Sequence, residues 1–221
     1  MKTRYETAVA DSTPRLGLYA ICDASIRPDL PMLEKSEQLL RGGVRWIQLR
    51  MKEVEAAEAV VLGRKIVALC HQHGCRCIFN DRVDFALICG ADGAHVGQED
   101  LPIAEARQVL GPGRILGATV RNSAMVELAR RGGADYVGLG PVFPTRTKHV
   151  DAPPIGIEGL RAVVRQSALP VVAISGISLA NIGQVAAAGA SGAAVASELL
   201  SGQDVAARAR ELASEFARGC Q

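Results

Sequence analysis

The chain alternates short β-rich runs with longer amphipathic runs, and this alternation limits its fold more than any other feature. Helical runs rich in alanine and leucine lie at residues 30–40, 55–73, 123–131, 157–167, 179–189 and 204–218. Several of them end at glycine, which supplies the left-handed cap that turns a chain into its next strand. A repeated unit of strand and helix predicts a single (β/α)8 TIM barrel. The eight β-rich runs are residues 16–23, 44–50, 75–81, 93–97, 114–120, 135–140, 170–175 and 192–197.

An open, doubly wound sheet is the alternative architecture. Such sheets bind dinucleotides through a glycine-rich fingerprint after the first strand. Here the first strand runs into AICDASIRP at residues 20–28, which carries no such fingerprint. The barrel is therefore favoured, and its functional residues are expected in the loops that follow the carboxyl ends of the strands.

Length and composition favour one globular domain. The chain has 221 residues, of which 48% are hydrophobic, enough for one sizeable core. We expect a loose arm at residues 1–15 and a catalytic barrel at residues 16–221. A formal net charge of +2 and an aromatic content of 4% argue against nucleic acid as a partner.

The six cysteines lie in apolar or strand-like runs of a full-sized domain, which is typical of proteins in a reducing compartment. The first 15 residues contain no apolar run of signal-peptide length, and no run approaches the length of a membrane span. We therefore expect a cytoplasmic protein without a membrane partner.

The end of the second strand carries a cationic pattern. Gln48, Arg50 and Lys52 alternate, so their side chains project to one side, into the barrel mouth. Two cations and an amide facing inward are costly unless an anion meets them. The alternative is a strand end whose charged side chains simply reach solvent, and for Lys52 alone this is the favoured interpretation. The pattern of Gln48, Arg50 and Lys52 together favours an anion site. Trp46 is expected on the opposite face, packed under a helix.

Acidic residues follow the third and fourth strands. Asp81 and Asp100 would be neighbours at the top of a barrel, where a Mg²⁺ ion could bind between them and substrate phosphate. Each also precedes a helical run, so each could cap a helix instead. From these residues alone, helix capping is the favoured interpretation.

The last strands end in small residues, which let backbone N–H groups approach a phosphate at the usual phosphate position of this fold. Gly176 lies in the turn after the seventh strand, and Ala196 and Ser197 end the eighth. An ordinary tight turn is the alternative for the glycine. The loop after the sixth strand, with Thr145, Arg146, Thr147 and Lys148, would bridge the two anion sites.

Five segments of the chain, in this order, resemble thiamine phosphate synthases. The resemblance extends over residues 16–200, essentially the whole barrel. The segments are WIQLRMKE, FNDRVDFAL, GADGAHVGQEDLP, GADYVGLGPVFPTRTK and LPVVAISGI.

The resemblance implies a reaction between two small phosphorylated substrates. The family joins hydroxymethylpyrimidine diphosphate to hydroxyethylthiazole phosphate, giving thiamine phosphate and pyrophosphate, with Mg²⁺ as cofactor. It is understood to pass through a carbocation-like pyrimidine, so no protein nucleophile is needed. Residues implied in diphosphate binding are Gln48, Leu49, Arg50, Met51, Lys52, Asn80, Thr119 and Lys148.

Further roles are also implied by the resemblance. Asp81 and Asp100 would bind Mg²⁺, while Arg50, Lys52 and Lys148 would stabilise the departing pyrophosphate and so act in catalysis. The thiazole phosphate would contact the loop Thr145, Arg146 and Thr147, and the backbone of Gly176, Ala196 and Ser197. A homodimer is the expected assembly, although nothing in the sequence specifies it.

The chain departs from the family pattern at three positions. Thr119 stands where serine is usual, and its hydroxyl is kept. Arg121 stands where histidine is common, which adds a cation. Ser175 replaces the first of two glycines, and Gly176, which matters for the approach of phosphate, remains.

Two other functions share these features. A thiazole tautomerase has the same barrel, but such enzymes tend to lose the metal acids and the lysine at the second strand, both of which this chain keeps. A ligand-binding regulator without turnover is the second alternative, and the complete diphosphate set argues against it.

One cluster resembles a metal site but lies away from the strand ends. Cys70, Cys75 and Cys77 span a helix end, a glycine turn and a strand start at the amino-terminal face, with His71 and His73 nearby. A structural Zn²⁺ is therefore the less favoured reading.

Overall fold

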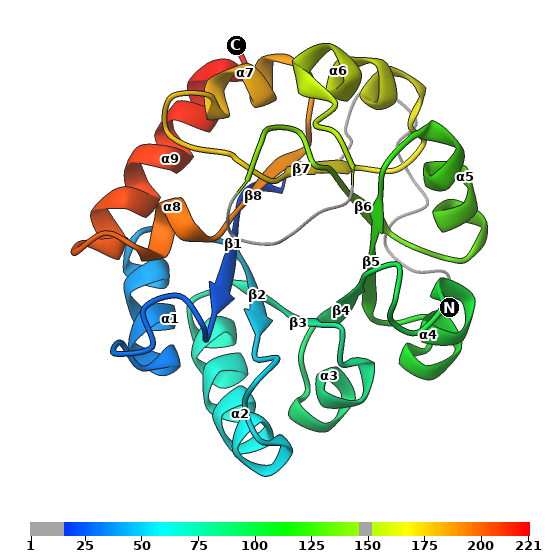
Figure 1. The fold of residues 1–221 in the computed structure, drawn as a ribbon. Helices are drawn as coiled ribbons and strands as arrows, with labels where there is room; N and C mark the ends of the chain where they lie inside the picture. The colour runs from blue at the N-terminus through cyan, green and yellow to red at the C-terminus, as the bar shows by residue number, and fades with distance from the viewer. Residues whose placement is uncertain (1–15, 146–151) are drawn as a thin grey trace.

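The computed structural model describes residues 16–145 and 152–221 and forms a closed barrel of parallel strands (Figure 1). β1 pairs with β2 on one side and with β8 on the other, where Gly17 lies opposite Gly192. This closure confirms the predicted TIM barrel and excludes the open sheet. The strands are β1 Gly17–Asp23, β2 Trp46–Arg50, β3 Arg76–Asn80, β4 Gly93–Val96, β5 Ile115–Val120, β6 Tyr136–Leu139, β7 Val171–Ile174 and β8 Gly192–Val195.

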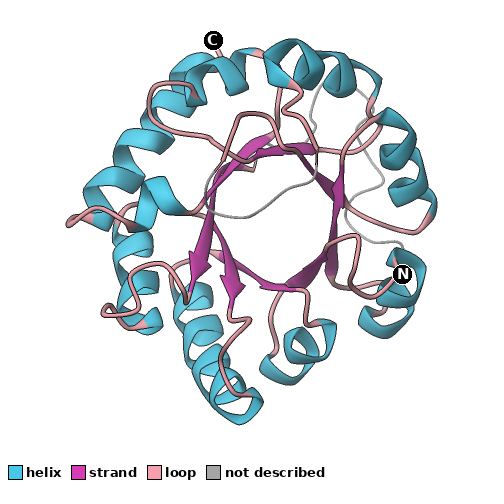
Figure 2. Cartoon of the chain, viewed as in Figure 1, coloured by secondary structure: helices cyan, strands magenta, loops and turns pink. Residues whose placement is uncertain are grey.

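The helices form an outer ring around the strands (Figure 2). Each connection between parallel strands crosses by way of a helix, as the strand-helix alternation predicts. The helices are α1 Met32–Arg41, α2 Ala56–Gln72, α3 Val83–Cys89, α4 Ile103–Leu110, α5 Ser123–Arg131, α6 Gly156–Gln166, α7 Ile182–Ala187, α8 Ser197–Leu200 and α9 Val205–Gly219. No helix in the described ranges is both long and apolar enough to cross a membrane.

Glycine ends the helices as predicted, with a shift of one residue at some of them. Gly90 directly follows α3 and has a φ of 71°. After α5, Gly132 keeps a helical conformation, and it is Gly133 that takes the left-handed φ of 88°. In both turns glycine allows a backbone angle that other residues rarely adopt.

The apolar core has two parts. The larger part fills the layer between the strands and the helices, where residues such as Leu49, Phe79 and Leu116 are buried. The smaller part lies inside the barrel and includes Tyr19 and Tyr136. A barrel of this size is filled by side chains, so its interior is a packed core below the mouth.

Trp46 belongs to the interior, so the expectation that it packs under a helix is wrong. Its ring stacks on Tyr19 with 6.0 Å between ring centroids and meets Tyr136 edge-on at 6.2 Å. The reason is strand periodicity: Trp46 has the same parity as Gln48 and Arg50, so the three face the same side of β2.

Candidate active site

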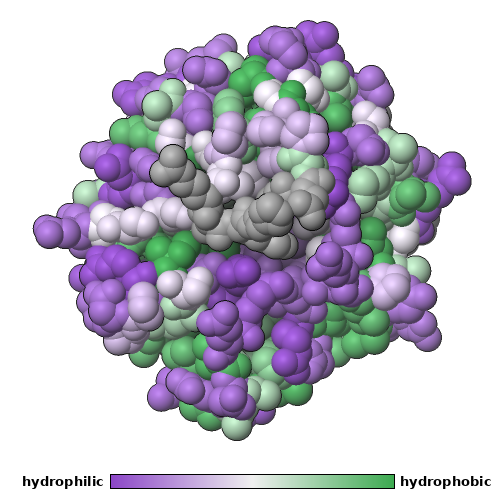
Figure 3. Space-filling view, viewed as in Figure 1, coloured by the Kyte–Doolittle hydropathy of each residue, from purple (hydrophilic) through white to green (hydrophobic). Residues whose placement is uncertain are grey.

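Two cavities open among the loops at the carboxyl ends of the strands. Figure 3, in the same view as Figure 1, shows that hydrophilic side chains predominate on this face, with apolar patches between them. One cavity of about 330 Å³ lies beside β7 and β8, and another of about 230 Å³ lies beside β2 and β3. Arg50 lines the first cavity and Lys52 lines the second. The end of β2 and the residues just after it therefore place one cation at each cavity.

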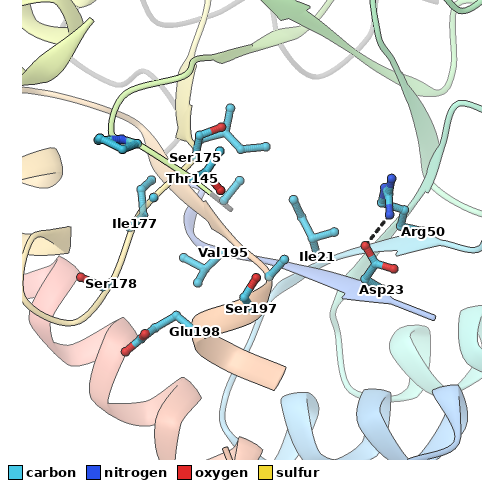
Figure 4. Close-up of a pocket in the computed structure, with 15 residues that line it drawn as sticks. Ile21, Asp23, Arg50, Thr145, Ser175, Ile177, Ser178, Val195, Ser197 and Glu198 are labelled. Carbon is cyan, nitrogen blue, oxygen red and sulfur yellow. Dashed lines mark hydrogen bonds and ion pairs between the residues drawn. The ribbon is translucent and has the colours of Figure 1, made fainter. Parts of the chain in front are cut away.

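The larger cavity contains the predicted phosphate position (Figure 4). Gly176 has a φ of 65°, and a Cβ added there would lie 2.4 Å from the carbonyl oxygen of Pro144. Only glycine fits this turn, so the backbone can approach a ligand closely. The other residues that line the cavity include Thr145, Ser175, Ala196 and Ser197.

Arg50 is held by a residue that the sequence reasoning missed. A guanidinium nitrogen of Arg50 lies 2.6 Å from Oδ2 of Asp23, which is 3% exposed. Oδ1 of Asp23 accepts hydrogen bonds from the backbone N–H and the hydroxyl of Ser25. The ammonium of Lys35, itself buried, donates to the backbone oxygen of Asp23 at 3.0 Å. The end of β1 therefore fixes the cation that faces the larger cavity.

Asp23 could have been found from the sequence. It closes the first strand in LGLYAICD, at the same edge of the barrel as the other strand-end residues. An acid at a strand end beside a strand that ends in arginine is a candidate ion pair, because neighbouring parallel strands end at the same edge of the sheet.

Asp81, one of the two predicted metal acids, lines the second cavity, and Asp100 lies against it. Neither one caps a helix: the N-cap positions of α3 and α4 are Arg82 and Pro102, without side-chain capping bonds. Asp100 instead accepts from the backbone N–H of Gly97 at 2.7 Å. The capping interpretation, favoured from the residues alone, is therefore wrong for these described residues.

Asp81 and Asp100 interact directly. Burial raises the pKa of Asp81, but a hydrogen bond with Asp100 and the ammonium of Lys52, 2.8 Å away, lower it below its ordinary value. Burial and the contact with Asp81 raise the pKa of Asp100. Two carboxyl groups this close together form a donor set between which a divalent cation can bind.

The pair fits Mg²⁺ better than a metal that needs an all-protein cage. Within residues 16–145 and 152–221, no group of three or more histidine, cysteine or acidic side chains is arranged to hold a metal ion. Mg²⁺ is commonly bound by one or two carboxylates, with water and substrate phosphate completing its octahedron. Asp81 and Asp100 are the residues here that would hold it.

Asn80 offers an unused hydrogen-bond donor next to this pair. Its Nδ2 is one of two buried side-chain polar atoms in the described part of the chain that have no partner. Such a donor is costly to bury unless a ligand accepts from it. Asn80 also lines the smaller cavity, with Leu49 and Met51.

Gln48 and Thr119 join a polar network inside the barrel. Gln48 donates to the hydroxyl of Tyr19 at 3.1 Å, and Oγ1 of Thr119 lies 2.9 Å from Nε2 of His95. Burial lowers the pKa of His95 to about 4, so the imidazole is neutral at neutral pH. His95 is a barrel residue, as expected. Because its imidazole is neutral at neutral pH, it does not offer a positive charge to a phosphate group.

Three predicted loop residues, Arg146, Thr147 and Lys148, lie outside the described residues. Arg121, where the family often has histidine, is exposed.

At the opposite face, Cys70, Cys75 and Cys77 are buried free thiols. His71 bonds Asp92, with 3.0 Å between Nε2 and Oδ2. Among the described residues of this face, no three or more histidine, cysteine or acidic side chains are arranged to hold a metal ion.

Comparisons with known proteins agree on one family. The family profile described as thiamine monophosphate synthase matches residues 18–199. The chain is 50% identical to a thiamine-phosphate synthase of Myxococcus xanthus, over 95% of this chain and 97% of the relative. It is 43% identical to one of Methanospirillum hungatei, over 89% and 96%.

A solved structure shows the same similarity. The thiamine phosphate pyrophosphorylase from Pyrococcus furiosus superposes with a TM-score of 0.85 at 36% identity, covering 93% of this chain and 97% of that one. With the profile spanning nearly the whole barrel, this chain belongs to the thiamine monophosphate synthase family.

Proposed function

We propose that the chain joins hydroxymethylpyrimidine diphosphate to hydroxyethylthiazole phosphate in a Mg²⁺-dependent transfer that releases pyrophosphate. The observation that carries the proposal is the pair of cavities at one barrel mouth, one with a close-approach glycine and the other lined by Asp81, which interacts with Asp100. A reaction between two phosphorylated substrates needs two anion sites side by side. Arg50 and Lys52, two residues apart at the end of β2, supply a cation to each cavity.

The pyrimidine diphosphate would bind on the side of β2, β3 and β5. Lys52 would meet its phosphates within the smaller cavity, and Arg50 would meet them from the neighbouring edge of the larger one. Nδ2 of Asn80, which lacks a partner in the described chain, would donate to this substrate. Asp81 and Asp100 would hold Mg²⁺, which when bound neutralises charge that develops on the departing phosphates.

The thiazole phosphate would bind on the side of β7 and β8. Backbone N–H groups near Gly176 and Ser197 would meet the phosphate, as in the common phosphate site of this fold. The pyrimidine C–O bond breaks with its electron pair leaving on pyrophosphate, and the thiazole nitrogen forms the new C–N bond. Holding the two substrates in adjacent cavities supplies orientation for this step.

A discontinuous assay tests the proposal. Purified protein is incubated with both substrates, with Mg²⁺ or with EDTA, and thiamine phosphate is quantified by chromatography. We expect product only with Mg²⁺. Folded protein that binds thiazole phosphate in a titration but makes no product would instead support the tautomerase or the binding protein, which are separated by assaying thiazole isomerisation.

Substitutions test the residue roles. We expect Asp81→Ala and Lys148→Ala each to lower turnover at least tenfold, or about 1.4 kcal/mol of transition-state stabilisation. Asp81→Ala would remove a ligand of the Mg²⁺ ion, and Lys148→Ala would remove a positive charge that faces the departing phosphates. Lys65→Ala, which changes an exposed lysine on the outer surface of α2, is the control and should stay near wild type. Near-normal turnover in both site variants would contradict these roles.

Location and assembly are also proposals. The six free cysteines support a reducing, cytoplasmic setting. A homodimer is tested by sedimentation velocity at several protein concentrations, where a single species at the mass of one chain would contradict it.

A further inference from the structure

A chain of four hydrogen bonds crosses the barrel interior beneath the mouth. Gln48 Nε2 donates to Tyr19 Oη at 3.1 Å, and the hydroxyls of Tyr19 and Tyr136 are 2.7 Å apart. Tyr136 Oη lies 3.0 Å from His95 Nδ1, and His95 Nε2 lies 2.9 Å from Thr119 Oγ1. This series of hydrogen bonds thus begins and ends at Gln48 and Thr119, which are expected to contact the diphosphate substrate. It links β1, β2, β4, β5 and β6.

Two glycines make room for this series of hydrogen-bonded side chains. His95, Gly117 and Tyr136 are consecutive partners across β4, β5 and β6, so the two rings meet over Gly117. A Cβ on Gly117 would lie 2.4 Å from both His95 Nδ1 and Tyr136 Oη, in the space of their hydrogen bond. A Cβ on Gly138, which pairs with Thr119, would lie 3.1 Å from the His95 ring. The backbone is therefore shaped around this histidine.

The donors of the chain can be counted. Gln48 donates to Tyr19, and each phenol has one hydrogen to give. If Tyr19 donates to Tyr136, Tyr136 donates to His95 Nδ1, and His95 Nε2–H donates to Thr119, both phenolic hydrogens and the imidazole hydrogen are used. With the proton on Nδ1 instead, and with Gln48 Nε2 donating to Tyr19, one phenolic hydrogen has no acceptor among the four bonds, which is costly at a buried site.

We propose that His95 is a positioning residue: held in its Nε2–H tautomer by Tyr136, it donates to Thr119 Oγ1 and so leaves the threonine hydroxyl hydrogen for an anionic substrate oxygen. The opposite tautomer would accept the hydroxyl hydrogen and turn oxygen lone pairs toward an anion, which is repulsive. The effect of His95 on turnover rests on the proposed function, whereas the assignment of its Nε2–H tautomer does not.

Imidazole ¹⁵N NMR of the wild-type protein tests the tautomer without any substrate. Long-range ¹H–¹⁵N spectra distinguish a protonated from a bare ring nitrogen, and His95→Gln identifies the signals among the four histidines of the chain. We expect the proton of His95 on Nε2. A proton on Nδ1 overturns the proposal, whether or not the protein makes thiamine phosphate.

Two matched hydroxyl deletions test the direction of the chain. Tyr136→Phe removes the donor to Nδ1, so we expect the His95 signals to become those of mixed tautomers or of the Nδ1–H form. Tyr19→Phe removes the same atom one step further away and leaves Tyr136 able to donate, so the Nε2–H signals should persist. Equal effects of the two variants, with both folded by circular dichroism, would overturn the assigned direction.

A double-mutant cycle tests whether the chain acts through Thr119. Thr119→Ser keeps the hydroxyl and should retain kcat/KM, whereas Thr119→Val removes it. Tyr136→Phe alone should lower kcat/KM about fivefold or more, and it should cause no further loss when added to Thr119→Val, because interacting residues are not additive. Losses that multiply would show a merely structural role for Tyr136. Absence of product from wild-type protein would contradict the proposed function and leave the NMR result to decide the tautomer.

Discussion

At the scale of single residues, Asp23 is the residue that positions a substrate-facing cation. Its carboxylate is nearly inaccessible and divides its two oxygens between Arg50 and Ser25. A charge-assisted bond of 2.6 Å sets both the place and the direction of the guanidinium, which flexible arginine side chains otherwise lack. The guanidinium of Arg50 is therefore already oriented at the larger cavity, where the proposed function needs it.

Removing that carboxylate charge should impair the enzyme through the position of Arg50, which lines the larger cavity together with Asp23. We expect Asp23→Asn to lower kcat/KM about tenfold, because a misplaced guanidinium loses much of its effect on the departing phosphates. Steady-state kinetics with varied diphosphate substrate measures it. Asp29→Asn is the matched control, since Asp29 pairs with Arg27 on the surface. Unchanged kcat/KM in the Asp23 variant would refute the positioning role.

Gly117 shows how strongly one position depends on the packing around it. A Cβ there would lie 2.2 Å from Cζ of Tyr136, inside a barrel without spare volume. We expect Gly117→Ala to lower the free energy of unfolding by about 1–3 kcal/mol, the usual cost of overpacking a core.

Urea denaturation measures this change. Gly113→Ala is the matched control, because a Cβ on Gly113 has nothing within 4 Å. Equal midpoints for the two variants would mean that the interior accommodates a methyl group, and the tight packing inferred around His95 would be wrong.

At the scale of elements, Asp92 joins three segments at the amino-terminal face. Its carboxylate accepts from the backbone N–H of Cys77 at 2.9 Å, where β3 begins, and contacts His71 at the end of α2 and Arg76. Burial alone would raise the pKa of Asp92, but these bonds lower it below its ordinary value of 3.8. The carboxylate therefore ties α2 and β3 to the start of β4 while it is ionised.

This tie should make stability depend on pH in the acid range. Because the folded-state pKa is depressed, its contribution is fully present above the unfolded pKa and is lost as pH falls through the folded value. We expect the free energy of unfolding to fall below about pH 4. Asp92→Asn should be less stable at neutral pH and lose less on acidification. Parallel pH profiles for both proteins would contradict this.

At the scale of the whole molecule, closure of the barrel depends on its last helix and begins at Leu16. The backbone N–H of Leu16 donates to Ser191 at 2.7 Å, next to the pairing of β1 with β8. α9 packs on α1, α7 and β1, and it buries Val205, Leu212 and Phe216. The seam between the first and last strands is therefore covered by the carboxyl-terminal helix.

Two truncations separate these contributions. Deletion of residues 1–15, the arm expected from the sequence, should leave the melting temperature and turnover near wild type, because every strand of the barrel lies after these residues. Deletion of residues 202–221 should prevent folding, because it uncovers the apolar surface beneath α9. Circular dichroism and gel filtration measure both. A folded monomer after the second deletion, or loss of folding after the first, would contradict this account.

Much of the site could be predicted from strand ends. Alternation along β2 puts Gln48 and Arg50 on one face, and the same rule places Trp46 with them, although the tryptophan was assigned to the other face. Periodicity is a local property of the chain, so it could be worked out from the residues alone. The small residues after the last strands could be found in the same way.

The remaining features depend on which strands become neighbours. Helix capping was the favoured role for Asp81 until the barrel brought it to Asp100 and Lys52. The ion pair of Asp23 with Arg50 and the chain from Gln48 to Thr119 likewise connect residues far apart in sequence.

The sequence alone determined the repeated strand-helix unit, the barrel and the face that carries the chemistry, because these follow from periodicity and turn residues. The tertiary structure decided which carboxylate meets which cation, where two carboxyl groups meet and which phenol contacts a histidine. Such pairings depend on the register of closed strands and on burial, which sets the strength of charges and hydrogen bonds, and neither is a property of any short segment.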